Sequence, residues 1–127
     1  MSEREAVNAL VIAADDEHDI VELVRIVLSR AGYEVLTASQ GQEALDLART
    51  RVPDLCVLDG VMPGLEGFEV LRALREDERT AAVPVLILTA TVTEEREVRR
   101  HGVEPDAFMK KPFEAEALLA EVERLLG

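Results

Sequence analysis

The sequence has few of the residues that mark disulfide-rich, membrane-spanning or nucleic-acid-binding proteins. Its one cysteine, Cys56, cannot form an internal disulfide, which favours a reducing, cytoplasmic setting. Aromatic residues make up 3% of the chain and tryptophan is absent, so stacking platforms for single-stranded nucleic acid are not expected. The longest apolar runs, at residues 10–14 and 83–88, are far shorter than the ~20 residues of a membrane-spanning helix.

Basic residues are scarce relative to acidic ones. The 127 residues include 14 Lys and Arg against 26 Asp and Glu, a formal net charge of −12. Phosphate backbones and anionic lipids need clustered basic side chains, so we expect neither a direct nucleic-acid partner nor a membrane surface. A bound metal cation is compatible with this charge. The length and the 48% hydrophobic content fit a single domain over residues 1–127.

Short apolar runs alternate with helical patterns along the whole chain. Strands are predicted at residues 10–14, 33–36, 55–58, 83–88 and, more weakly, 107–109. Helices are predicted around residues 20–31, 44–48, 68–74 and 118–126, and in the highly charged segment 93–101. This alternation predicts an α/β fold with a five-stranded parallel sheet, order 2-1-3-4-5, flanked by five helices in a flavodoxin-like, three-layer arrangement.

Polar or charged residues follow four of the five predicted strands. They are Asp15 and Asp16 after the first strand, Asp59 after the third, Thr89 after the fourth, and Lys110 and Lys111 after the fifth. Each alone would suit a cap, a turn or a solvated surface. In the predicted strand order, however, the three aspartates converge at one edge of the sheet, where ligands bind in such folds. Converging carboxylates repel one another, which favours a bound hard cation such as Mg²⁺.

At these residues the sequence resembles the CheY-like receiver domains of response regulators in two-component signalling. The matching segments are residues 15–17, residues 59–64 followed by Gly67, residues 88–90 and residues 111–113. Their order and spacing agree with the family pattern, and the resemblance extends from about residue 9 to residue 126.

The resemblance implies a phosphorylation site that needs Mg²⁺. Asp59 would accept the phosphoryl group, and Asp15, Asp16, Asp59 and the backbone carbonyl of Val61 would hold the ion. The implied donor is a partner phosphohistidine on a histidine kinase or a histidine phosphotransfer protein. The implied target is a downstream protein or a fused output domain.

The resemblance also implies a switch. Thr89 would hydrogen-bond the phosphoryl group and Lys111 would pair with it, whereas Lys110 does not directly precede proline and has no such role. Phe108 matches the switch aromatic, so phosphorylation is expected to change the surface formed by the fourth helix, the fifth strand and the last helix. The chain is expected to be a monomer or a weak homodimer.

Two alternative functions differ from this interpretation. An aspartyl-phosphate phosphatase of the haloacid dehalogenase type needs a second aspartate where this sequence has Val61, so self-phosphotransfer and autodephosphorylation are expected rather than enzymatic turnover. The apolar Val61 also leaves the rate of dephosphorylation open. A phosphorylation-independent, receiver-like interaction module remains the alternative function.

Several features depart from the family pattern or lie outside it. The segment 102–107, with Pro105, predicts that the fourth helix ends early and that the output surface is reshaped. Cys56 is interpreted as core filler. Neither His18 nor His101 has a second histidine or cysteine nearby, so no transition-metal site is expected. The charged run 94–100 is interpreted as a solvated face.

Overall fold

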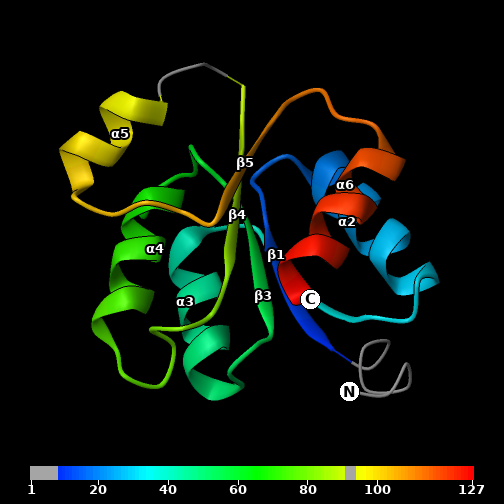
Figure 1. Ribbon diagram of the computed structural model, residues 1–127, viewed down its shortest axis with the longest axis horizontal. Helices are drawn as coiled ribbons and strands as arrows, with labels where there is room; N and C mark the ends of the chain where they lie inside the picture. Colours follow the sequence, from blue (N-terminus) through cyan, green and yellow to red (C-terminus); the bar gives the residue numbers. More distant parts are fainter. Residues whose placement is uncertain (1–8, 91–93) are drawn as a thin grey trace.

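The computed structural model describes residues 9–90 and 94–127, which form alternating strands and helices (Figure 1). The strands are β1 (Leu10–Ala14), β2 (Glu34–Ala38), β3 (Leu55–Asp59), β4 (Val85–Thr89) and β5 (Ala107–Lys110). The helices are α2 (His18–Arg30), α3 (Gly41–Thr50), α4 (Gly67–Glu76), α5 (Glu94–His101) and α6 (Ala115–Leu126).

The strands form one parallel sheet in the order β2-β1-β3-β4-β5, which confirms the predicted fold. Helices α3, α4 and α5 cover one face, and α2 and α6 cover the other (Figure 1). The side chains of β1 alternate accordingly: Ile12 belongs to the apolar cluster with α3 and α4, and Val11 to the cluster with α2 and α6. Every residue of β1, β3 and β4 is buried, which explains their continuous apolar runs.

Two strands begin later than their apolar runs predict. Tyr33 precedes β2, and its N–H donates to the carbonyl of Leu28 at the end of α2. Val83 precedes β4, and its N–H donates to the carbonyl of Thr80 in a turn. Both residues are apolar because they lie beside the core, but their hydrogen bonds belong to the preceding turn. Hydrophobicity alone therefore places the strand boundary too early.

The described helices are short and amphipathic. The longest, α2, has 13 residues and buries Val21, Val24 and Leu28 against the sheet. No helix in the described part of the chain combines the length and the apolar character needed to cross a membrane.

The charged segment before β5 does form a helix, and α5 packs on the core through Val98. Residue 93 of the predicted helix lies outside the described residues. Gly102 ends the helix: it has a φ of +68° and its N–H donates to the carbonyl of Val98 at 2.8 Å. In the unusual segment that follows, Asp106 Oδ2 lies 2.8 Å from both the Val85 N–H and the Arg75 guanidinium. These bonds connect the entrance of β5 to β4 and α4.

Cys56 lies in the core of β3 and is 1% exposed. Its burial raises the pKa of the thiol to about 12, so the reactive thiolate is disfavoured at neutral pH. This environment agrees with a packing role.

Candidate functional site

The carboxyl ends of the sheet bring Asp15, Asp59 and Lys111 together. Asp15 follows β1, Asp59 ends the adjacent β3, and Lys111 follows β5. The ammonium Nζ of Lys111 lies 2.7 Å from Asp15 Oδ2 and 3.4 Å from Asp59 Oδ2. The three side chains are only 3%, 8% and 10% exposed, in that order, so their charges interact with little screening by water. Two carboxylates therefore share one buried counter-charge.

Backbone groups fix the orientation of these side chains. The second oxygen of Asp59, Oδ1, accepts a hydrogen bond of 3.2 Å from the Val61 N–H. Asp15 Oδ1 accepts one of 2.9 Å from the Glu17 N–H. The Lys111 N–H donates to the Thr89 carbonyl at 2.8 Å, which places the lysine beside the end of β4. Each charged residue is thus held before any ligand arrives.

The first residue of α4 packs directly on the backbone of Asp59. The N–H of Gly67 donates to the Gly60 carbonyl at 3.2 Å. A Cβ atom at position 67 would lie 2.3 Å from the Asp59 carbonyl oxygen, closer than atoms can approach without a backbone shift. Glycine is therefore required where the helix meets the strand end.

We expect Gly67→Ala to lower the free energy of unfolding by about 1–3 kcal/mol, because the methyl group would push α4 away from Asp59. Urea denaturation measures the change. The matched control is Gly60→Ala, whose added Cβ would lie 3.5 Å from its nearest neighbour, an ordinary contact. Equal losses in the two variants would contradict the steric explanation.

The surroundings of Asp59 favour its protonated form. Burial is the largest cause, followed by the charge of Asp15, and a hydrogen bond with the Asp16 carboxyl acts in the same direction. The Val61 N–H and the charge of Lys111 oppose these effects. The net result raises the pKa of Asp59 from 3.8 to about 7. At neutral pH and without a further cation, a large fraction of Asp59 is protonated.

Lys111 stays a cation in this site. Its burial alone would lower the pKa of the amine, but a hydrogen bond with Asp15 and the charge of Asp59 outweigh the burial and raise the pKa above 10.5. Glu17 contributes in the same direction through an ion pair of 3.2 Å between its Oε1 and Nζ.

The donor set fits a hard divalent cation. Oxygen atoms of Asp15, Glu17 and Asp59 lie within 4.8 Å of one another. The buried Asp15 Oδ2 has the Lys111 ammonium, 2.7 Å away, as its close partner among the residues that the structure describes. Buried carboxylate oxygens that lie next to other carboxylates are the type of ligand that Mg²⁺ uses.

The remaining residues predicted for the site surround this cluster. Asp16 is exposed and borders an open pocket with His18 and Glu43. Val61 is 67% exposed beside Asp59. Thr89 is buried at the end of β4, in register with Lys110 of β5.

Phe108 of β5 is half-buried, and its ring centroid lies 5.9 Å from that of Phe68 on α4. Glu17 lies in the segment 15–17 that resembles the family, but the resemblance assigns it no role. Its position directly after two aspartates was the only feature of the sequence that pointed to a role in the site. Its contact with Lys111 depends on residues far apart in the chain, so only the fold reveals it.

A doubly wound sheet with an acidic cluster and a lysine at its carboxyl edge matches a known class of signalling protein. The family model for the response regulator receiver domain matches residues 11–123, and the chain belongs to this family. The fold is similar to that of the chemotaxis response regulator CheY4 of Vibrio cholerae. The TM-score is 0.84 at 36% identity, over 93% of this chain and 98% of that one.

Curated relatives agree with this assignment. The chain is 41% identical over 119 residues to the transcriptional regulatory protein PhoP of Bacillus subtilis, covering 94% of this chain and 49% of PhoP. It is 34% identical to PilH of Pseudomonas aeruginosa, covering 94% of this chain and 98% of PilH. The chain spans about half the length of PhoP and several other relatives. It is a regulatory receiver domain of the two-component type.

Proposed function

We propose that Asp59 accepts a phosphoryl group from a phosphohistidine in a Mg²⁺-dependent step. The observation that supports this most directly is the buried cluster of Asp15, Asp59 and Lys111 at the carboxyl edge of the sheet. A carboxylate nucleophile, an acidic cation site and a fixed positive charge are the parts that phosphoryl transfer requires.

In the proposed transfer, a carboxylate oxygen of Asp59 attacks the phosphorus atom. The new P–O bond forms as the P–N bond to the imidazole breaks, and the imidazole leaves with the bonding electron pair and takes up a proton. Lys111 pairs with a phosphoryl oxygen through Nζ, which lies 3.4 Å from Asp59 Oδ2 before the reaction. Thr89, at the end of the neighbouring strand, provides a hydroxyl donor to another phosphoryl oxygen.

We expect Asp15, Asp16, Asp59 and the backbone carbonyl of Val61 to hold the ion. Oxygen atoms of Asp15 and Asp59 lie within 4.8 Å of each other and of an oxygen of Glu17. Bound Mg²⁺ supplies positive charge that favours the ionised carboxylate and neutralises the phosphoryl oxygens. This charge matters because the pKa of Asp59 without an ion is about 7, and only the ionised form is a nucleophile.

Phosphorylation would then change the surface of α5, β5 and α6 through Thr89 and Phe108. In the described conformation Phe108 packs on Phe68 of α4, so a displaced Thr89 would let the ring repack at that contact. The partners in this scheme are a histidine kinase or a histidine phosphotransfer protein on the donor side. On the output side they are a downstream protein or a fused output domain, in a monomer or a weak homodimer.

The proposal is tested by incubating the protein with a small phosphodonor such as acetyl phosphate and Mg²⁺, followed by intact mass spectrometry. We expect one added phosphoryl group on the wild type, none on Asp59→Asn, and loss of uptake in EDTA. The matched control is Asp46→Asn, an exposed position on α3 whose Oδ1 accepts a hydrogen bond from Gln42. This variant should be modified as fully as wild type.

Three outcomes would overturn the assignment. Equal uptake by Asp59→Asn and wild type would move the acceptor elsewhere. No uptake by a folded, Mg²⁺-binding wild type would favour the phosphorylation-independent interaction module. Continuous release of phosphate from a simple phosphomonoester would point to a turnover phosphatase. The exposed Val61 offers no acid or base for that reaction.

A further inference from the structure

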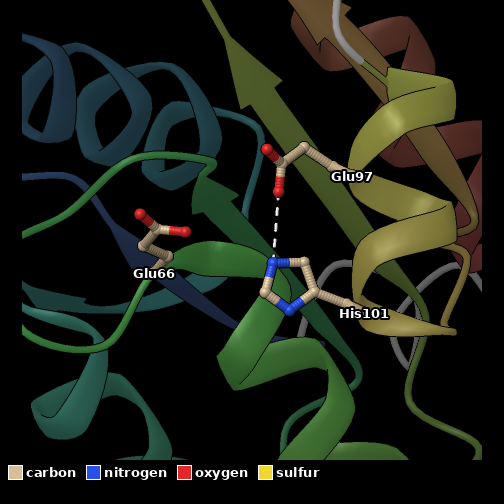
Figure 2. A group of neighbouring side chains, drawn as sticks. All are labelled: Glu66, Glu97 and His101. Atoms are coloured by element: carbon tan, nitrogen blue, oxygen red, sulfur yellow. Dashed lines mark hydrogen bonds and ion pairs between the residues drawn. The ribbon is translucent and has the colours of Figure 1, made fainter.

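A second cluster of metal-ligating side chains lies between α4 and α5, away from the acidic site. Glu66 immediately precedes α4, and Glu97 and His101 lie on α5 (Figure 2). One ligand atom from each residue lies within 4.8 Å of the others. Figure 2 shows Glu97 and His101 in contact, with the Glu66 carboxylate to one side of them. Two elements distant in the sequence thus present one imidazole and two carboxylates to the same point.

The spacing of these atoms suits a tetrahedral ion. Glu97 and His101 are four residues apart on one helix and share a face. Their atoms Oε2 and Nε2 are 3.1 Å apart. Ligands at 2.0–2.1 Å from a tetrahedral metal ion are separated by about 3.3 Å, so this pair needs little movement to accept one. The Glu66 carboxylate, within 4.8 Å of both, would close in on the ion. A water molecule would complete the four positions, as in sites with three protein ligands.

The imidazole is held in place by packing. The side chain of His101 is 9% exposed, and its ring stacks on Phe68 with centroids 5.7 Å apart and planes at 17°. Arg100 lies 3.8 Å from the other oxygen of Glu97, Oε1, which leaves Oε2 directed at the histidine. The two carboxylates carry a charge that matches a dication. The imidazole ring of His101 is therefore already in a fixed position before an ion binds.

We propose that Glu66, Glu97 and His101 bind a first-row transition-metal dication of the Zn²⁺ type, fastening α5 to the start of α4. Imidazole with carboxylate selects such ions over Mg²⁺, which prefers oxygen ligands alone. Phe68 contacts both His101 and Phe108, so the ion would sit beside the aromatic side chain implicated in switching. Two glutamates here take the place of the second histidine or cysteine whose absence argued against a transition-metal site.

The test is titration of the full chain with Zn²⁺ by calorimetry and with Co²⁺ by visible absorption. Excess Mg²⁺ is present to occupy the acidic site around Asp59. We expect one ion per chain and the absorption bands of tetrahedral Co²⁺. His101→Ala and Glu97→Gln should each weaken Zn²⁺ binding at least ~10-fold. Replacing a residue that only hydrogen-bonds a metal ligand already lowers metal affinity about 10–100-fold. Glu97→Gln keeps the side-chain shape and guards against a folding defect in the histidine variant.

The matched control is His18→Ala, which removes the other histidine of the chain. Its Zn²⁺ affinity should equal that of wild type, and Zn²⁺ should raise the melting temperature of both proteins but not of Glu97→Gln. Absence of Zn²⁺ binding by wild type would overturn the proposal. So would binding that persists in Glu97→Gln and His101→Ala, or that is lost in His18→Ala.

Discussion

Replacing Asp59 with asparagine is expected to raise the free energy of unfolding of the Mg²⁺-free protein by about 2–4 kcal/mol at pH 8. The folded protein raises the pKa of this carboxyl from 3.8 to about 7, so ionising Asp59 costs more in the folded state than in the unfolded chain. Asparagine keeps the size of the side chain and removes the ionisation. Most substitutions destabilise a protein, so stabilisation here would be a specific signature of the cost of ionising a buried carboxyl beside Asp15.

The raised pKa of Asp59 also determines how the stability of the protein changes with pH. Between pH 4 and 7 the folded protein binds more protons at Asp59 than the unfolded chain does. The contribution of Asp59 to stability is therefore lost as pH rises through this range, and little more is lost above about pH 8. The gain from Asp59→Asn should accordingly be largest at pH 8 and should fall to near zero at about pH 4.

Urea denaturation from pH 4 to pH 8 in EDTA measures this difference. The exposed Asp46→Asn variant is the control, and its stability should stay within about 0.5 kcal/mol of wild type at every pH. Mg²⁺ should stabilise wild type and reduce its difference from Asp59→Asn. An Asp59→Asn variant no more stable than wild type at pH 8 would show that Asp59 is not destabilised by burial and by Asp15.

Replacing Lys111 with methionine is expected to lower the free energy of unfolding by about 3 kcal/mol at pH 8 in EDTA, because it leaves buried carboxylates without their counter-charge. Lys111 lies within 3.4 Å of both Asp15 and Asp59, and methionine preserves most of its volume. The loss should be smaller at pH 5, where Asp59 is protonated in the folded protein.

The adjacent lysine provides the control for this prediction. Lys110 is exposed, and Lys110→Met should change stability by no more than about 0.5 kcal/mol. A double-mutant cycle isolates the ion pair: Lys111→Met should cost less in the Asp59→Asn background than in wild type. An identical cost in both backgrounds would show that Lys111 stabilises the protein by packing, without a contribution from Asp59.

The sequence predicted the order of the elements because each element has its own local pattern, and it predicted the strand order because right-handed crossovers leave few topologies. The run 10–14 predicted β1 without error, since a strand covered on both faces is continuously apolar. The boundaries of β2 and β4 were less accurate. Tyr33 and Val83 are apolar but use their N–H groups in turns, and hydrophobicity does not record where a hydrogen bond goes.

The sequence by itself determined which residue types stand at the carboxyl ends of the strands. It thereby determined the convergence of Asp15 and Asp59, because parallel strands all end at the same edge of a sheet. Only the tertiary structure decided how deeply these carboxylates are buried, that Glu17 pairs with Lys111, and that Glu66 meets His101. Those contacts depend on how helices and loops pack across the sheet. Packing depends on the fit of many distant side chains, which no local pattern specifies.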